Sequence, residues 1–138
     1  HFVQDNISKS SYGVLRGVHL QKGEHAQAKL VSCLAGKVFD VAVDLREDSP
    51  TFGQWFGVEL TPENKLQLYV PRGFGHGFSV LSETAIFSYK CDNFYHKESE
   101  GSVIWNDKDL NIDWKLPADK VLLSEKDSQL PTFAEKNF

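Results

Sequence analysis

Short runs of β-branched and aromatic residues, separated by turn residues, occupy most of the first two thirds of the chain. Their composition and period-two alternation predict strands rather than helices. The predicted strands span residues 14–20, 28–34, 37–45, 55–60, 66–70, 77–80 and 85–91. We therefore expect an all-β protein, and we favour a small barrel over an open sandwich because closure removes exposed strand edges.

The last third of the chain has a different pattern of polar and apolar residues. After Cys91 the residues are mainly polar or charged with scattered aromatics, and only the stretch from Ser124 indicates a short helix. A chain of 138 residues has the usual size of one domain. We expect residues 1–138 to form a single domain with an irregular or short helical C-terminal segment. Because the chain contains no Met, we expect the natural translation start to lie outside it.

Composition narrows the partners and the compartment. Fifteen basic and nineteen acidic residues give a net charge of −4, so no broad basic face is available for a nucleic acid. No apolar run approaches the roughly 20 residues that cross a membrane, and the first ten residues lack the apolar stretch of a signal peptide. Cys33 and Cys91 lie in apolar runs, which is typical of reduced, buried thiols. We expect a cytoplasmic protein that binds neither nucleic acid nor membrane.

The run 37–45 places two carboxylates on one face of a strand. Alternation puts apolar side chains on one face, whereas Asp40 and Asp44 share the other. Asp44 lies beside a turn and is expected on a solvated face. Asp40 lies in the middle of the strand, where a solvated face and a polar cavity both fit its position.

The segment GVLRGVHLQ places Arg16 and His19 on one predicted strand. In a hairpin symmetric about Glu24, His19 stands opposite Lys29 with both side chains on one face. The cationic neighbour favours the neutral imidazole that a general base requires, although two exposed polar residues on a hairpin also explain the segment. Strand parity sends Arg16 and His19 to opposite faces, unless Gly17 hosts a β-bulge that brings them together.

The segment PRGFGHGF surrounds His76 with three glycines. Such a backbone either holds the imidazole and approaches a ligand closely, or forms a turn in which the histidine is incidental. A metal site formed by His19, His25 and His76 is a second interpretation, but no carboxylate follows at an obvious ligand spacing and a facing lysine would repel a cation. His25 and His96 are next to charged residues and are expected at the surface.

Two further residues have simple structural interpretations when taken alone. Tyr89 shares a strand face with Phe87 and other apolar residues, as a core aromatic does. Asp127 ends the sequence Ser-Glu-Lys-Asp, which has the spacing of a helix capping box with Asp in place of Glu.

The motif P-x-G-x-x-H at residues 71–76 resembles the second motif of the cupin superfamily of β-barrels. The first cupin motif, H-x-H with a following Glu, is absent. The segment GVLRGVHLQ, with Lys29 in the next strand, stands in its place and resembles the dTDP-4-dehydrorhamnose 3,5-epimerase family, a metal-free cupin branch. The similarity covers nearly the whole chain, through residues 4–6, 71–78, 89–95, 100–101, 105–107 and 124–127.

The resemblance implies a cupin-like double-stranded β-helix, or jelly-roll barrel, and catalytic roles for four residues. His19 matches the family's catalytic base, and Asp127 matches the carboxylate that pairs with it. Tyr89 matches the tyrosine proposed as the acid on the opposite face of the sugar. Lys29 matches the residue that stabilises the oxyanion.

Five more residues match substrate contacts of the family. Arg16, Gln4 and Tyr95 match nucleotide or pyrophosphate contacts, His76 matches the motif's histidine near the site, and Asn6 matches a further substrate-binding position. The implied ligand is a dTDP-linked 4-keto-6-deoxy sugar, and the implied assembly is a homodimer with no cofactor and no metal. Family members carry an N-terminal segment that reaches the partner subunit, and we expect this chain to begin after it.

The implied reaction converts dTDP-4-dehydro-6-deoxyglucose to dTDP-4-dehydrorhamnose, an isomerase step in dTDP-rhamnose biosynthesis. A 4-keto sugar has acidic C–H bonds at C3 and C5, so inversion needs a base on one face, an acid on the other and stabilisation of the enolate. The alternatives are a metal-dependent cupin isomerase or dioxygenase and a non-catalytic sugar-binding cupin. The non-catalytic alternative gives no reason for the four catalytic candidates to occur together.

Overall fold

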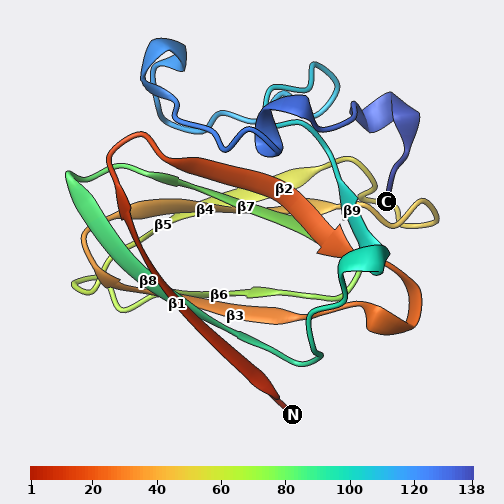
Figure 1. Ribbon diagram of the computed structural model, residues 1–138, viewed down its shortest axis with the longest axis horizontal. Helices are drawn as coiled ribbons and strands as arrows, with labels where there is room; N and C mark the ends of the chain where they lie inside the picture. Colours follow the sequence, from red (N-terminus) through yellow and green to blue (C-terminus); the bar gives the residue numbers. More distant parts are fainter.

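Two antiparallel sheets, stacked face to face, form the body of the protein (Figure 1). The computed structural model describes residues 1–138. The first sheet has the order β1-β8-β3-β6 and the second the order β5-β4-β7-β2-β9. The strands are β1 (Gln4–Ser11), β2 (Leu15–Gln21), β3 (Lys29–Ala35), β4 (Val38–Asp44), β5 (Trp55–Leu60), β6 (Gln67–Val70), β7 (Phe74–Val80), β8 (Thr84–Cys91) and β9 (Glu100–Ser102). The all-β prediction is confirmed.

The C-terminal segment packs on the outer face of the five-stranded sheet, where Figure 1 shows it in blue. It contains only single-turn 3₁₀ helices, so the helix expected from Ser124 is reduced to three residues. The short helices of the chain are η1 (Gly23–His25), η2 (Lys97–Ser99), η3 (Ala118–Lys120), η4 (Asp127–Gln129) and η5 (Phe133–Glu135). No helix is long and apolar enough to cross a membrane.

Two apolar clusters, one on each face of the five-stranded sheet, form the core. Between the sheets, Val38 and Ala42 of β4 pack with Phe78 and Phe87. The opposite face of β4 packs beneath the C-terminal segment and its Trp114. Both faces of β4 are therefore covered, although its sequence alternates as a half-exposed strand does.

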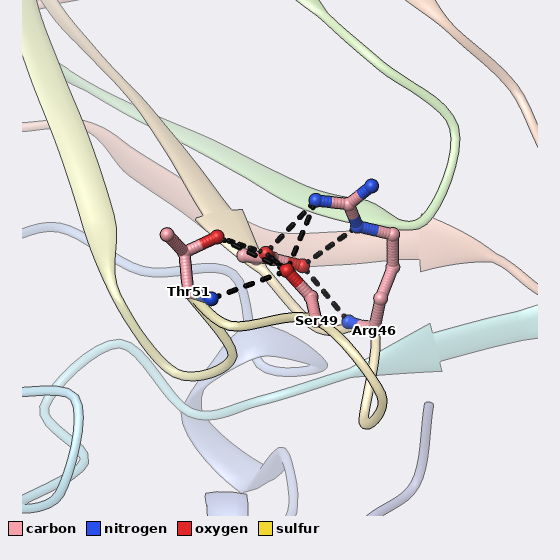
Figure 2. Close-up of polar contacts among 4 residues, drawn as sticks. Arg46, Ser49 and Thr51 are labelled. Atoms are coloured by element: carbon pink, nitrogen blue, oxygen red, sulfur yellow. Dashed lines mark hydrogen bonds and ion pairs between the residues drawn. The ribbon is translucent and has the colours of Figure 1, made fainter.

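The covering of both faces corrects the prediction for Asp44. This carboxylate is 1% exposed rather than solvated, and it accepts hydrogen bonds from the backbone N–H and Nε of Arg46, at 3.0 and 2.9 Å. Figure 2 shows Arg46, Ser49 and Thr51 gathered around it, and both hydroxyls donate to Oδ2. The guanidinium of Arg46, followed by the two hydroxyls, lowers the pKa of Asp44 well below its ordinary range despite burial. The carboxylate thus stabilises the turn that follows β4 through these hydrogen bonds.

All seven predicted strands exist, but two strands were missed and one pairing is wrong. The strand β1 escaped prediction because the side chains on both of its faces are mostly polar, and β9 is only three residues long. The predicted hairpin between β2 and β3 does not form, since β2 pairs with β7 and β9 while β3 pairs with β6 and β8. The connection between them crosses from one sheet to the other.

A bulge at Gly17, which the sequence left open, is present. The β2–β7 register shifts between Arg16 and His19, and Gly17 has a φ of +127°. A Cβ there would lie 2.7 Å from the Cα of Gly77, so only glycine fits. The extra residue brings Arg16 and His19 to the same cavity.

Candidate active site

A polar cavity lies between the two sheets. It consists of two adjoining pockets of about 190 and 270 Å³, and His19, Lys29 and Tyr89 line both. The first pocket is also lined by Gln4, Asn6, Leu20, Gln21, Gln27, Cys91, Tyr95, Glu100 and Lys126. The second is also lined by Ser8, Arg16, His76, Gly77, Phe78 and Phe87. Eight of the nine predicted site residues therefore line one cavity, and the ninth, Asp127, contacts His19.

Strand pairing explains how the cavity gathers these side chains. His19 on β2 is the cross-strand partner of His76 on β7. Lys29 on β3 pairs with Cys91 on β8, two residues from Tyr89, so Lys29 and Tyr89 point to the same face. The Nζ of Lys29 lies 5.4 Å from the centroid of the Tyr89 ring. Lys29 and His19 do face one cavity, but from opposite sheets rather than across a hairpin.

The imidazole of His19 is held by a buried carboxylate. Its Nε2 lies 2.7 Å from Oδ1 of Asp127, which is 2% exposed. Oδ2 of Asp127 accepts the backbone N–H of Gly17 at 3.1 Å. With Nε2 committed to the carboxylate, Nδ1 of His19 carries the free lone pair.

The setting of Asp127 keeps it ionised. Burial raises the pKa of this carboxyl, but the hydrogen bond from His19, the charge of His19, the N–H of Gly17 and the charge of Arg16 outweigh burial, so the pKa lies below its ordinary value. The capping interpretation is half right, because Ser124 Oγ accepts the N–H of Asp127 at 3.1 Å. The carboxylate itself turns toward His19 instead of back to the cap.

Lys29 and Tyr89 are both perturbed by burial. Burial lowers the pKa of the Lys29 amine, and the neighbouring acidic groups of Cys91, Asp40 and Glu100 partly oppose the change. Burial raises the pKa of the Tyr89 phenol, so the hydroxyl keeps its proton at neutral pH. Tyr89 packs beside Phe87, with ring centroids 6.0 Å apart, and still reaches the cavity. Its side chain therefore packs with the core and also lines both pockets.

His76 lies deeper in the cavity and has a carboxylate partner of its own. Its Nε2 is 2.7 Å from Oδ1 of Asp40, which is fully buried. Asp40 is therefore not on a solvated face; it lies behind His76, which itself lines the second pocket.

A polar rim surrounds the first pocket. Tyr95 donates its hydroxyl to Glu100, and its backbone N–H reaches Oε1 of Gln4 at 3.1 Å. Lys126 pairs with Glu100 at 2.6 Å. Burial raises the pKa of Glu100, but the hydrogen bonds from Lys126 and Tyr95 outweigh burial, so the pKa lies below its ordinary value. Asn6 Nδ2 approaches the sulfur of Cys91 at 3.9 Å.

Several residues that line the cavity were not predicted as site residues. Glu100 and Lys126 lie in segments of polar, irregular sequence, and only the matching blocks at 100–101 and 124–127 indicated that these positions matter. Gln21 and Gln27 flank the crossing between the sheets and could not be placed once a hairpin was assumed. Ser8 lies on the missed strand β1.

The remaining histidines lie away from the cavity. His25 and His96 are partly exposed at the surface, as expected, and their rings stack on one another with centroids 3.6 Å apart. His25 therefore does not converge with His19 and His76. No group of three or more His, Cys, Asp or Glu side chains is close enough to hold a metal ion.

The arrangement combines a carboxylate-held imidazole, a protonated phenol and an ammonium around one cavity. These groups can remove a proton on one side of a ligand, return one on another side and stabilise negative charge between the two steps. A β-barrel with such a site belongs to the class of isomerases that work by acid–base chemistry at carbon.

Comparison with known proteins identifies the family. The family model described as dTDP-4-dehydrorhamnose 3,5-epimerase matches residues 1–135. The chain belongs to this family, and it is an isomerase with a cupin-like β fold. The epimerase of that name from Shigella flexneri is 55% identical over 137 residues, which cover 99% of this chain and 75% of the relative. The epimerase of the same name from Salmonella typhimurium is 58% identical over 133 residues, which cover 94% of this chain and 70% of the relative.

Solved structures agree with the family assignment. The crystal structure of a dTDP-4-dehydrorhamnose 3,5-epimerase from Elizabethkingia anophelis NUHP1 superposes with a TM-score of 0.99 at 75% identity, covering 100% of this chain and 75% of that one. A dTDP-6-deoxy-D-glucose-3,5-epimerase from Legionella pneumophila, in complex with dTDP-4-keto-L-rhamnose, superposes with a TM-score of 0.93 at 55% identity, covering 99% and 74%.

Proposed function

We propose that this protein inverts C3 and C5 of a dTDP-linked 4-keto-6-deoxy sugar, converting dTDP-4-dehydro-6-deoxyglucose to dTDP-4-dehydrorhamnose in dTDP-rhamnose biosynthesis. The observation that carries the proposal is the convergence of His19, Lys29 and Tyr89 on one cavity, with Asp127 behind His19. The family assignment and the keto-rhamnose complex of the Legionella relative support the choice of substrate.

Proton removal is assigned to His19. The 4-keto group acidifies the C–H bonds at C3 and C5, and Nδ1 of His19 is free to accept a proton because Nε2 is bonded to Asp127. The buried carboxylate then stabilises the imidazolium, as the aspartate does in a Ser-His-Asp triad. Asp127 is thus a positioning residue, whereas His19 touches the reacting atom.

Enolate stabilisation and reprotonation are assigned to Lys29 and Tyr89. Removing a proton places negative charge on the C4 oxygen, which the ammonium of Lys29 can stabilise directly. Tyr89 lies on the sheet opposite His19, so its hydroxyl is the proton donor for the other face of the sugar. Inversion results because the proton leaves and returns on different faces.

Nucleotide binding is assigned to the polar residues at the openings of the cavity. Arg16 is exposed and lines the second pocket, where its guanidinium suits a pyrophosphate oxygen. Gln4, Asn6 and Tyr95 line the first pocket and offer amide groups and an aromatic ring to the nucleoside. His76, deep in the second pocket, is assigned to the sugar.

We also propose a cytoplasmic homodimer whose subunit is a single domain. Strand β1 is the outer strand of its sheet, and Ile7 on it is 70% exposed, so its unpaired edge and apolar side chain favour contact with a second copy. The two free, buried thiols are typical of a reducing compartment. The net charge of −4 favours no nucleic acid partner. The chemistry assigned here uses side chains alone and requires no cofactor or metal.

Incubation with dTDP-4-keto-6-deoxyglucose in heavy water tests the proposal. Proton NMR should show deuterium entering at C3 and C5 and resonances of the inverted sugar appearing. Exchange at only one carbon would restrict the activity to a single centre. A substrate that stays unchanged, with neither exchange nor product, would refute the proposed reaction.

A further inference from the structure

Asp40 carries the only buried side-chain polar atom that has no hydrogen-bond partner. One oxygen, Oδ1, is bonded to Nε2 of His76 at 2.7 Å, but Oδ2 is unpaired. The residue is completely inaccessible to solvent and lies in the middle of β4, between its cross-strand partners Val58 and Phe78. An unpaired carboxylate oxygen in such surroundings destabilises a fold.

The same strand shows that a buried carboxylate here can be fully satisfied. Asp44 lies four residues further on the same face and accepts hydrogen bonds from Arg46, Ser49 and Thr51 on both of its oxygens. Asp40 has His76 as its one partner. The structure therefore supports one reason for a carboxylate at position 40, which is its hydrogen bond with His76.

His76 faces the cavity in the same manner as His19. The two histidines are cross-strand partners on β7 and β2, and each binds a buried carboxylate through Nε2. Nδ1 makes no hydrogen bond within the protein in either ring. Both imidazoles line the second pocket, and Nδ1 is the nitrogen of each ring that is left free for a ligand.

We infer that Asp40 is a positioning residue for sugar recognition: it holds His76 with the proton on Nε2, so that Nδ1 accepts a hydrogen bond from a sugar hydroxyl. The tautomer of an imidazole is set by the hydrogen bond that its other nitrogen makes. Without the carboxylate, the ring can flip or carry its proton on Nδ1, and it then offers a donor where the hydroxyl needs an acceptor. This inference rests on the proposed function, which places the sugar in the second pocket.

Asp40→Leu tests the inference, because leucine has nearly the shape of aspartate but accepts no hydrogen bond from His76. Asp44→Leu is the matched control on the same face of the same strand. The loss of the positioning acceptor should reduce kcat/KM for the sugar nucleotide by about 10- to 100-fold, while affinity for dTDP, which lacks the 4-keto sugar, stays unchanged. Asp44→Leu should retain the wild-type kcat/KM. A folded Asp40→Leu variant with wild-type kcat/KM would overturn the inference.

A double variant separates positioning from a general structural effect. If Asp40 acts through His76, then Asp40→Leu should cause no further loss of kcat/KM in a His76→Gln background. Losses that multiply would show that Asp40 acts independently of His76 and would contradict the inference.

Nitrogen-15 NMR of the histidine side chains tests the tautomer without relying on activity. In the wild-type protein, His76 should carry its proton on Nε2 and none on Nδ1. A proton on Nδ1, in the other neutral tautomer or in the imidazolium, would refute the acceptor role even if Asp40→Leu failed to fold. Because this spectrum requires no substrate, failure of the proposed reaction and failure of the Asp40 inference give different results.

Discussion

Replacing Asp127 with Asn preserves the shape of the side chain but removes one of its two acceptors. In the wild-type protein Oδ1 faces Nε2 of His19 at 2.7 Å and Oδ2 accepts the N–H of Gly17 at 3.1 Å. An amide has one oxygen and one NH₂ group, so it cannot accept from both neighbours. In the variant, the single amide oxygen can therefore accept a hydrogen bond from Gly17 or from His19, but not from both.

The choice determines which nitrogen of His19 carries the proton. If the amide oxygen keeps the hydrogen bond from Gly17, the NH₂ group faces Nε2 of His19. Nε2 must then accept a hydrogen bond from the amide, and the imidazole carries its proton on Nδ1. The base is lost in that orientation. If the oxygen faces His19 instead, a buried N–H of Gly17 loses its acceptor at a cost of about 1–3 kcal/mol. This preference alone makes the productive orientation roughly 5- to 150-fold rarer.

The missing negative charge adds to the loss of base, because an amide stabilises the imidazolium far less than a carboxylate does. Together the two effects should lower turnover by about 10²–10⁴-fold, the range of general base catalysis and of the analogous change in a Ser-His-Asp triad. The assay is the initial rate of deuterium entry at C3 and C5 in heavy water. Thermal unfolding provides the control for folding.

A rate for Asp127→Asn within about threefold of the wild type would refute this reasoning, since both the tautomer and the charge would then be irrelevant. A large loss accompanied by unfolding would be uninformative alone, so Asp127→Glu serves as a second variant. It restores the charge, and any activity that it recovers over Asn assigns the loss to chemistry.

Three further predictions concern the acid, the metal and the turn. Tyr89→Phe should reduce net inversion by about 10²–10⁴-fold while solvent exchange continues through His19, and a parallel fall of both would exclude Tyr89 as the acid. Turnover should survive exhaustive chelation, and its loss and recovery with an added metal would support a metallocupin. Asp44→Asn should destabilise the fold by about 1.5–3 kcal/mol at pH 7. Because its folded pKa is lowered well below the ordinary value, the wild-type advantage should begin to fall below about pH 4 and shrink steadily as pH drops towards the folded pKa; an equal advantage at pH 7 and pH 2 would contradict this.

The fold was predictable from sequence where one face of a strand is apolar and the other polar. The alternation in β4 identified the strand but could not show that the face carrying Asp44 lies against the other sheet, or that Arg46 and the following turn enclose its carboxylate, which is why Asp44 was misplaced. Strand β1 was missed for the opposite reason, because its inward side chains line a polar cavity instead of a core. The hydrophobic pattern of a strand indicates which residues are buried in an apolar core, but it does not indicate polar residues that face a buried functional cavity.

The site was predictable only in part from the residues themselves. His19 and Lys29 were expected to meet, but the hairpin argument was wrong, and the meeting depends on two sheets that sequence periodicity does not pair. Asp127 lies 108 residues from His19, and only the family resemblance linked them. The orphan oxygen of Asp40 is a tertiary property and could not be seen before the neighbours of β4 were known.

The central claim is that His19 is the single base for both carbons, and His19→Ala tests it most directly. Wild-type protein and variant are incubated with dTDP-4-keto-6-deoxyglucose in heavy water, and binding of the sugar nucleotide is measured on the same samples. The account predicts that deuterium entry is lost at both C3 and C5 while the sugar nucleotide still binds. Exchange at the wild-type rate at either carbon would contradict it and assign proton removal to another group.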